Sequence, residues 1–265
     1  VWAIKIMRFI LKSIGLRSAF FTAALDRNFH TVLGCKLNNI PTVGILHGAP
    51  SKYYNVYDFL AGFDGDRPMS VDKYGVWSTW WREYYIKHSK AYRPEQLYVS
   101  GPMRPLEISN KNDTPSVTKN TGNVKVLFIS EQLAVPHEVM PYLKMLLKDS
   151  TIDFFMKFRP HRDGFEEWLL KNEPGVLKNK NVKIFRGSMQ EAVNECDVVV
   201  GSHSTAVLEA LLQFKTPIFF NTDKWGDCFS FKEYGNNHPF FAESPDELSE
   251  KIKGVRLVSI GTLKD

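Results

Sequence analysis

The stretch DVVVGSHSTAVLEALL, residues 197–212, decides the fold of this chain. Three consecutive valines after Asp197 indicate a buried β-strand, because β-branched residues favour extended backbone and an uninterrupted apolar run is typical of a strand covered on both faces. Gly201 allows a tight turn, and the hydroxyl side chains that follow it are good helix N-caps. Residues 206–214 then predict a helix that ends before Pro217, so the stretch is a strand, a short polar turn and a helix.

The turn between this strand and this helix is a candidate ligand site. In open α/β folds, ligands bind at the carboxyl ends of the parallel strands. A helix start also offers backbone N–H groups and a partial positive charge, which suit a phosphate. We therefore expect residues 202–205 to contact an anion, and Glu209, on the helix face of Thr205, to accept hydrogen bonds from sugar hydroxyls. Helix capping alone would explain the hydroxyl side chains, but it leaves His203 and Glu209 without a role.

The alternation of strand and helix continues along the chain. We expect strands at residues 19–25, 42–46, 74–78, 96–100, 124–129, 152–158, 182–185, 197–200, 217–220 and 239–242. We expect helices at residues 1–17, 26–38, 79–90, 136–147, 164–171, 189–195, 206–214 and 245–253. Such alternation predicts an α/β protein with doubly wound parallel sheets.

Residues 107–123 carry almost no large apolar side chain and are the predicted linker. They separate a Rossmann-like domain over residues 1–106 from a second one over residues 124–265, and we expect the two to face each other across a cleft. The amino-terminal half is short for a full domain of this kind, so we expect it to be incomplete. The chain begins with Val1 rather than Met, as a fragment or a processed protein would.

Composition narrows the class of protein. The 265 residues are 43% hydrophobic and 24% charged, which is ordinary for a soluble globular protein. The net charge of +5 suits anionic small molecules or a lipid surface, but it is too small and too scattered to indicate nucleic acid. Three widely spaced cysteines predict neither disulfides nor a zinc site and favour a reducing compartment. With no transmembrane run and no secretory signal in this sequence, we expect a cytoplasmic location.

Several common site motifs are absent from the sequence. There is no GxGxxG, no GxxxxGK[ST] and no GxSxG, which counts against a nicotinamide enzyme, a P-loop ATPase and an α/β-hydrolase. Asp64 and Asp66 form a short acidic pair that is more typical of a turn than of a divalent-ion site. We therefore expect no bound metal and no cofactor.

A cationic cluster follows the predicted strand at 152–158. Residues 157–162 read KFRPHR, and Lys157, Arg159 and His161 are its candidate anion-binding side chains. Arginine suits a diphosphate because its planar guanidinium donates two parallel hydrogen bonds. The alternative interpretation is a solvated basic loop.

His47 stands at another strand end, directly after the apolar run 42–46. A neutral imidazole near pH 7 can take a proton from a hydroxyl, and Gly48 leaves space beside it. The alternative is a loop histidine bonded to backbone. Because His47, the cationic cluster and the 202–205 turn all follow strands, the sequence predicts one shared site.

Residues 1–17 predict a basic amphipathic helix. Four cationic side chains are interspersed among apolar ones, namely Lys5, Arg8, Lys12 and Arg17. Such a helix either rests on an anionic membrane face or covers the sheet as an ordinary surface helix.

These motifs resemble those of GT-B glycosyltransferases of bacterial surface and capsular polysaccharide synthesis. They are similar also to CDP-glycerol glycerophosphotransferases and GT-B sialyltransferases. Residues 40–48 look like the strand end whose histidine is the proposed base of the polyol-phosphate group, and residues 157–161 resemble a K-x-HP element with the last two residues reversed. Residues 202–209 look like a Ser/Thr-rich donor-phosphate motif, and residues 76–78 and 99–104 match the pattern between the domains. The likeness covers about residues 26–242.

The resemblance implies a metal-independent transfer of a sugar from a nucleotide-activated donor to a glycan or lipid-linked hydroxyl. The nucleotide-sugar would be a substrate rather than a cofactor, and no nucleic acid partner is expected. The acceptor would bind the amino-terminal domain and the donor the carboxy-terminal one, with His47 as the catalytic base. The residues expected to bind the donor are Arg104, Lys157, Arg159, His161, Ser202, His203, Ser204, Thr205 and Glu209.

Three alternatives remain open. The chain could move a polyol phosphate instead of a sugar, or epimerise a UDP-sugar, although the paired carboxylates expected for an epimerase are not evident. It could also be a non-catalytic carbohydrate-binding or scaffold protein. A transferase requires His47 and the 202–205 turn to face each other across one cleft, whereas a non-catalytic binding or scaffold protein does not.

Overall fold

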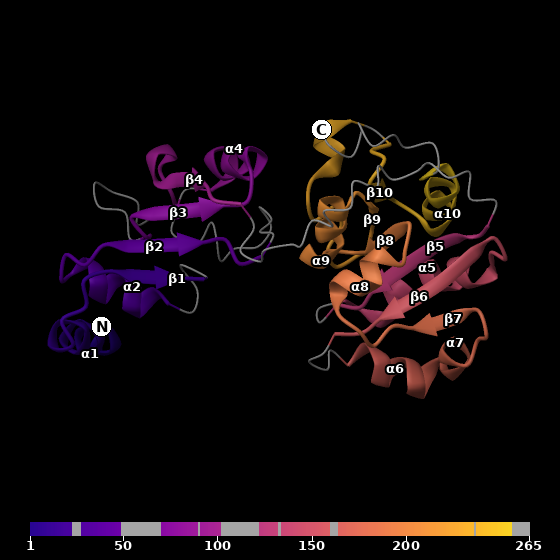
Figure 1. Ribbon diagram of the computed structural model, residues 1–265, viewed down its shortest axis with the longest axis horizontal. Helices are drawn as coiled ribbons and strands as arrows, with labels where there is room; N and C mark the ends of the chain where they lie inside the picture. Colours follow the sequence, from indigo (N-terminus) through magenta and orange to yellow (C-terminus); the bar gives the residue numbers. More distant parts are fainter. Residues whose placement is uncertain are drawn as a thin grey trace. The chain divides into compact units, whose positions relative to one another are not determined.

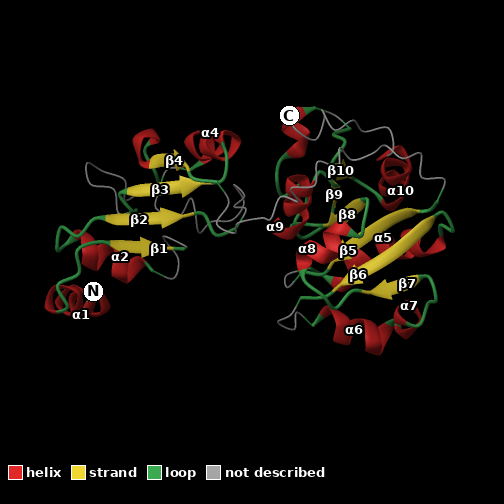
Figure 2. Ribbon diagram, in the orientation of Figure 1, coloured by secondary structure: helices red, strands yellow, loops and turns green. Residues whose placement is uncertain are grey.

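The computed structural model describes residues 1–22, 28–48, 70–89, 91–101, 122–131, 134–159, 164–235 and 237–255. The chain divides into two compact units, Val1–Pro105 and Leu106–Asp265, each built on a parallel β-sheet with helices (Figures 1 and 2). The α/β class with parallel sheets is therefore as the sequence predicts. Some sequence predictions fall on residues that lie outside the described ones: the start of the helix predicted at 26–38, the Asp64 and Asp66 pair, Arg104, most of the 107–123 linker, and His161.

The amino-terminal unit contains one four-stranded sheet in the order β1-β2-β3-β4, with every pair parallel. Its elements are α1 (Trp2–Ser13), β1 (Ala19–Phe21), α2 (Phe29–Lys36), β2 (Thr42–Ile45), β3 (Lys73–Val76), α4 (Thr79–His88), the 3-10 helix η1 (Pro94–Gln96) and β4 (Leu97–Val99). Aromatic side chains fill its core. Tyr74 of β3 stacks on Tyr92 with ring centroids 4.6 Å apart and meets Tyr85 of α4 edge to face.

The carboxy-terminal unit contains a six-stranded parallel sheet. Its elements are β5 (Val124–Ile129), α5 (Pro136–Lys148), β6 (Ile152–Lys157), α6 (Phe165–Asn172), α7 (Pro174–Leu177), β7 (Val182–Ile184), α8 (Met189–Asn194), β8 (Val198–Gly201), α9 (Thr205–Leu208), η2 (Glu209–Gln213), β9 (Thr216–Phe220), η3 (Phe231–Tyr234), β10 (Phe241–Ala242) and α10 (Pro245–Gly254).

The strand order of this sheet is β10-β9-β8-β5-β6-β7. Read from β7 and counted from the first strand of the unit, it is the doubly wound order 3-2-1-4-5-6. The winding reverses between β5 and β8, which are neighbours in space with Phe128 paired to Val200. Connections after β5 and after β8 therefore leave on opposite faces of the sheet, and their carboxyl ends mark the topological switch point of the unit.

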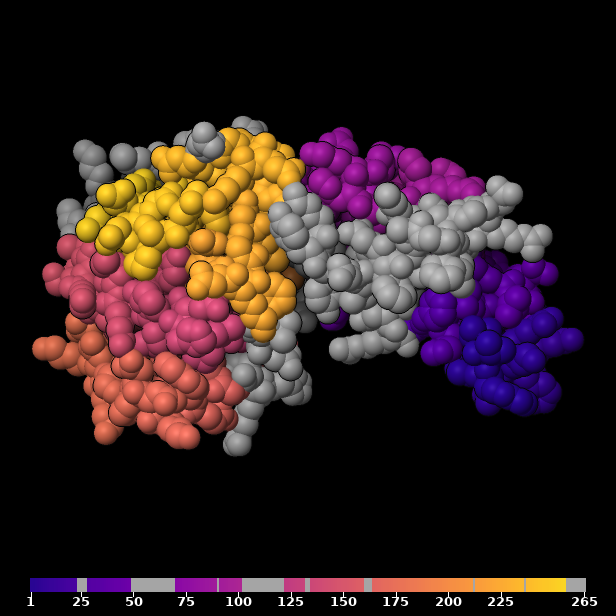
Figure 3. All heavy atoms as spheres, turned by 180° about the vertical axis from the view of Figure 1, so that it is seen from behind, coloured from indigo at the N-terminus to yellow at the C-terminus, as the bar shows by residue number. Residues whose placement is uncertain are grey.

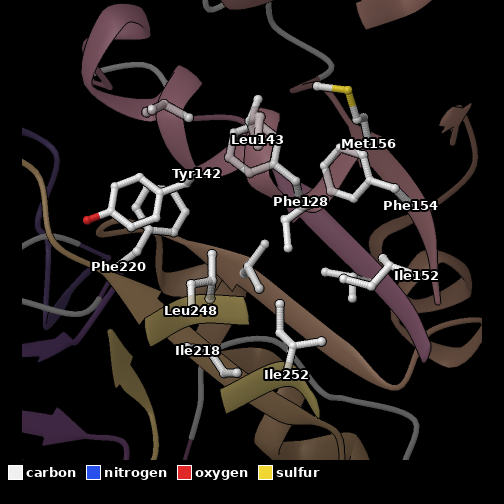
Figure 4. Close-up of a cluster of buried hydrophobic side chains, with 14 of the residues drawn as sticks. Phe128, Tyr142, Leu143, Ile152, Phe154, Met156, Ile218, Phe220, Leu248 and Ile252 are labelled. Carbon is white, nitrogen blue, oxygen red and sulfur yellow. The ribbon is translucent and has the colours of Figure 1, made fainter. Parts of the chain in front are cut away.

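One face of this sheet carries a large apolar core (Figure 4). Alternate residues of β5, β6, β8 and β9 point to it and meet side chains of α5 and α10, because side chains of a strand alternate between the two faces. Tyr142 of α5 stacks on Phe220 of β9 with ring centroids 4.4 Å apart. Figure 3, seen from behind, shows α10 in yellow beside the rose-coloured segment that contains α5, and the two helices pack against each other.

Three elements differ between the prediction and the structure in helix type, in presence or in length. The helix predicted over 206–214 is α-helical only to Leu208 and continues as η2. It ends at Phe214, which adopts a left-handed φ of 53°, and the N–H of Lys215 donates to the carbonyl of Ala210. Apolar composition does not distinguish these two helix types. The short helix α7 is missing from the prediction, since its Pro174 and Gly175 are typical of a turn, although proline is tolerated at the first helical position. The last strand is shorter than expected, at Phe241–Ala242.

Helix α1 confirms the predicted amphipathic helix but presents two apolar faces. Leu11 is buried and lies against Gly34 of α2, where an added Cβ would meet it at 3.1 Å. On the other side Trp2, Ile6 and Phe9 are exposed, with exposed fractions of 79%, 55% and 72%. No helix among the described residues is both long and apolar enough to cross a membrane.

Candidate functional site

Polar residues gather where the doubly wound sheet reverses its winding. Ser130 and Glu131 follow β5, Phe158 and Arg159 follow β6, and Ser202 begins the turn after β8. All three strands are parallel, so their carboxyl ends lie on one edge of the sheet. The carboxyl ends of β5 and β8, on either side of the switch point, are where an open α/β sheet binds its ligand.

Glu131 is the centre of this cluster. Its carboxylate is 4% exposed and accepts hydrogen bonds from the backbone N–H groups of three consecutive residues: Ser202 at 2.9 Å, His203 at 3.1 and 3.2 Å, and Ser204 at 3.0 Å. The hydroxyl of Ser202 donates to the second carboxylate oxygen at 2.6 Å. The turn after β8 therefore already surrounds an anion, and that anion belongs to the protein.

These hydrogen bonds decide the charge state of Glu131. Burial alone raises the pKa of a carboxyl group, because it disfavours the charged form. In Glu131 the hydrogen bond and charge of His203, the Ser202 hydroxyl and the backbone N–H of His203 together outweigh burial, so its pKa is lower than the ordinary glutamate value. Glu131 is thus a carboxylate at neutral pH, although it is buried.

His203 is held on two sides. Its Nδ1 lies 2.6 Å from Oε2 of Glu131 and 2.8 Å from Oγ of Ser202. The ring stacks on Trp225, which lies in the loop after β9, with centroids 4.5 Å apart and an angle of 26° between the planes. The side chain of His203 is 14% exposed. The carboxylate fixes one ring nitrogen and the indole fixes the plane of the ring.

Gly201 makes the close approach of Glu131 possible. A Cβ added at this position would lie 2.7 Å from Oε1 of Glu131 and 2.7 Å from Cγ2 of Val207, closer than real Cβ contacts. The glycine that the sequence suggests for a tight turn therefore serves a second purpose. It leaves space for a carboxylate that comes from another strand.

We expect Gly201→Ala to destabilise the carboxy-terminal unit by about 1–3 kcal/mol, the usual cost of overpacking a well-packed site. Urea denaturation followed by circular dichroism measures the loss. Gly175→Ala is the matched control, because a Cβ at Gly175 would meet no heavy atom within 4 Å. Equal stability of the two variants would show that Glu131 can move away without cost.

Of the cationic residues predicted at 157–162, the structure describes Lys157 and Arg159, and the two have different surroundings. Lys157 is buried, its ammonium donates to the carbonyl of Gly187, and burial lowers its pKa. Arg159 has an exposed side chain, and its backbone N–H donates to Oγ of Ser130 at 3.2 Å. Arg159 is therefore the better placed of these two residues to meet an anion from solvent, while Lys157 holds the loop after β7.

Three more predicted residues lie on the turn and the helix that follows it. Ser204 is the N-cap of α9, and its Oγ accepts from the N–H of Ala206 at 3.2 Å. Thr205 is the first residue of α9 and Glu209 the first of η2, and both side chains are half-buried. The described structure thus brings residues 202–204 around Glu131, with Thr205 and Glu209 on the helix that follows, while Arg159 bonds through its backbone to the neighbouring Ser130.

Comparison with solved structures places this geometry in a known fold. The chain is similar to a glycosyltransferase from Rickettsia africae (TM-score 0.56, 13% identity, 99% of this chain and 75% of that chain). It is similar also to Anabaena Alr3699/HepE in complex with UDP (TM-score 0.58, 14% identity, 97% and 75%) and to a UDP-GlcNAc 2-epimerase from Neisseria meningitidis bound to UDP-GlcNAc (TM-score 0.59, 11% identity, 95% and 71%). The chain has a GT-B fold. No protein-family model and no curated protein sequence matches it.

The amino-terminal unit of this GT-B chain carries the predicted base. His47 is exposed and follows β2 directly after Leu46, which is buried. The N–H of Leu46 donates to the carbonyl of Gly75 and its own carbonyl accepts from the indole of Trp77, both at 2.8 Å. His47 therefore leaves the sheet from a fixed backbone. Its place in a site shared with the carboxy-terminal unit stays a prediction.

The sequence analysis does not include two residues of this candidate site, Glu131 and Trp225. The position of Glu131 in the sequence indicates it as a site residue, because it follows the buried strand β5 as His47 follows β2. Trp225 had no such signal, since it lies in an irregular loop. Among the described residues no group of three or more His, Cys, Asp or Glu side chains is arranged to hold a metal.

Proposed function

We propose that this protein is a glycosyltransferase that moves a sugar from a nucleotide-activated donor to a hydroxyl acceptor. The observation that carries the proposal is the polar cluster at the switch point of the carboxy-terminal sheet, in a fold shared with proteins whose structures contain UDP or UDP-GlcNAc. Arg159, His203 and Thr205 would meet the donor phosphates there, and Trp225 holds the ring of His203 by stacking on it.

The reaction that we propose needs a base at the acceptor hydroxyl and charge neutralisation at the leaving phosphate. His47 would take the proton of the hydroxyl. Positive side chains at the switch point, Arg159 above all, would stabilise the leaving nucleotide. The acceptor in this proposal is a glycan or a lipid-linked sugar of surface or capsular polysaccharide synthesis.

A peripheral position at the cytoplasmic face of the membrane belongs to the same proposal. It is supported by α1, whose exposed Trp2, Ile6 and Phe9 could enter the interface while Lys5 and Lys12, also exposed, approach anionic headgroups. A lipid-linked acceptor would be presented at that surface.

A thermal-shift screen of the full chain against CMP, CDP, UDP and GDP tests the function. We also expect residues 122–265 alone to bind the preferred nucleotide, because the proposed phosphate contacts of the described structure all lie after residue 123. A ligand at one hundred times its Kd should stabilise the protein by about 2.7 kcal/mol. If this part of the chain folds and no nucleotide stabilises it, the donor assignment is wrong.

Turnover should not depend on a divalent ion, because cationic side chains can neutralise the leaving phosphate. Initial rates with EDTA, and with EDTA followed by excess Mg²⁺ or Mn²⁺, measure this. We expect equal rates under all three conditions. Loss of activity in EDTA that an added ion restores would contradict the metal-independent mechanism.

Epimerisation of a UDP-sugar is the second candidate, favoured by the similarity to structures of UDP-GlcNAc 2-epimerases from Neisseria meningitidis and Rickettsia bellii. Incubation with UDP-GlcNAc and no acceptor distinguishes the two. A transferase leaves the configuration at C2 of the sugar unchanged, whereas an epimerase produces UDP-ManNAc.

A further inference from the structure

The contact between Glu131 and His203 fixes where the imidazole carries its hydrogen. Ionised Glu131 can only accept hydrogen bonds, so the short contact to Nδ1 of His203 requires a hydrogen on that nitrogen. This holds whether the ring is neutral or protonated. Nε2, on the opposite side of the ring, can either donate or accept a hydrogen bond, depending on whether the ring is protonated. No hydrogen bond among the described residues uses it.

The backbone of the turn offers little to a second anion. The N–H groups of Ser202, His203 and Ser204 already point to the carboxylate of Glu131. The N–H of Ala206 is taken by Oγ of Ser204. The phosphate site expected from the sequence is thus already occupied by a carboxylate of the protein, and the imidazole of His203 has a second ring nitrogen, Nε2, that takes no part in these contacts.

We propose that Glu131 is a positioning residue, which holds His203 with hydrogen on Nδ1 and presents Nε2 to the diphosphate of the nucleotide donor. The inference rests on the proposed function for the identity of the ligand, but not for the geometry of the pair. Trp225 completes the arrangement, because stacking on the indole opposes a flip of the imidazole about its Cβ–Cγ bond.

The first test reads the tautomer directly. Long-range ¹H–¹⁵N correlation spectra of the full chain labelled with [¹⁵N]histidine assign the hydrogen of each imidazole, and His203→Gln identifies the signal. We expect hydrogen on Nδ1 of His203 in the wild type. In Glu131→Gln the amide can donate to Nδ1, so we expect the hydrogen to move to Nε2 or the two forms to mix. Hydrogen on Nε2 alone in the wild type would overturn the positioning role.

The second test asks whether this geometry serves a ligand. UDP should shift the ¹⁵N resonance of Nε2 of His203 and leave that of Nδ1 nearly unchanged. Uridine, which lacks the phosphates, should shift neither resonance. Glu131→Gln and His203→Gln should each weaken UDP binding by about tenfold, the size of one charge-assisted hydrogen bond. Binding of uridine should not change.

Asp197→Asn is the matched control for a purely structural carboxylate. Asp197 also accepts a backbone N–H from the neighbouring strand, that of Lys125 at 2.9 Å, but at the amino edge of the sheet. It should lower the melting temperature without changing UDP affinity. Equal losses of affinity in Glu131→Gln and Asp197→Asn, or wild-type affinity in His203→Gln, would refute the ligand contact. If the wild-type protein binds none of CMP, CDP, UDP and GDP, the ligand assignment falls with the proposed function, and the tautomer measurement still decides the positioning role.

Discussion

His47→Ala should lower kcat by about 10²- to 10⁴-fold, the usual contribution of a general base. At 1.36 kcal/mol for each factor of ten, this corresponds to about 3–5 kcal/mol of activation free energy. His47 follows an anchored strand end and is exposed, so its removal should disturb neither the sheet nor the core. The affinity for the nucleotide should hardly change, because the proposed phosphate contacts lie in the other unit.

Steady-state kinetics with saturating donor measure this effect, and His30→Ala in α2 is a matched control, since His30 is an exposed histidine of the same unit. Ser204→Ala and Arg159→Ala should show the opposite pattern, with weaker nucleotide binding before any change in kcat. Wild-type turnover by His47→Ala would return His47 to the interpretation of an ordinary loop histidine. Unfolding of this variant would do the same.

Glu131→Ala should destabilise the protein by about 3–5 kcal/mol, as the loss of one partner from a buried charged network does. The substitution leaves the buried hydroxyl of Ser202 and three N–H groups without their acceptor. Urea denaturation gives the change in the free energy of unfolding. Asp197→Asn should cost much less, because its carboxylate is bonded to a single backbone N–H at an exposed position. A loss below about 1 kcal/mol would mean that the turn is satisfied in another way.

The same network makes stability depend on pH. The pKa of Glu131 is lower in the folded protein than the ordinary glutamate value of 4.5, so the unfolded chain binds a proton more readily at acid pH. The stabilisation by Glu131 is therefore present above this ordinary value and is lost as the pH falls through the pKa of the folded state. Glu131→Gln should remove this part of the acid sensitivity, which denaturation curves at several acid pH values would measure.

Most of the fold could be predicted from short-range patterns in the sequence. The valine run before Gly201 and the strand at 124–129 are unmistakable, because parallel strands buried on both faces leave uninterrupted apolar runs. The hydroxyl side chains after Gly201 located the start of a helix, and Ser204 is the N-cap of α9. The stretch 206–214 is helical, but it changes from the α-helix α9 to the 3-10 helix η2 at Glu209, and apolar content does not distinguish these two helix types.

The candidate site could be predicted only in part, because its central contact joins distant segments. Residues 202–205 were recognisable from local turn chemistry, and they do lie at the sheet edge. Their partner Glu131 stands 71 residues before Ser202, and only the strand order brings the two together. The sequence showed the hydroxyl groups and N–H groups of the turn, but not that a carboxylate of the same chain already occupies them.

The switch point also has a consequence for the order of folding. Glu131 and Ser204 are separated by 73 residues, which include β6, β7 and β8, so their hydrogen bond closes a long loop. Contacts between residues so distant in sequence form late, since the entropy of loop closure opposes them until the intervening strands have paired. On the ribosome, the first half of this unit emerges with Glu131 but without the turn that satisfies its charge. The carboxylate of Glu131 finds its hydrogen-bond donors only after β8 and the turn that follows it have been synthesised, so the site forms together with the pairing of β5 and β8.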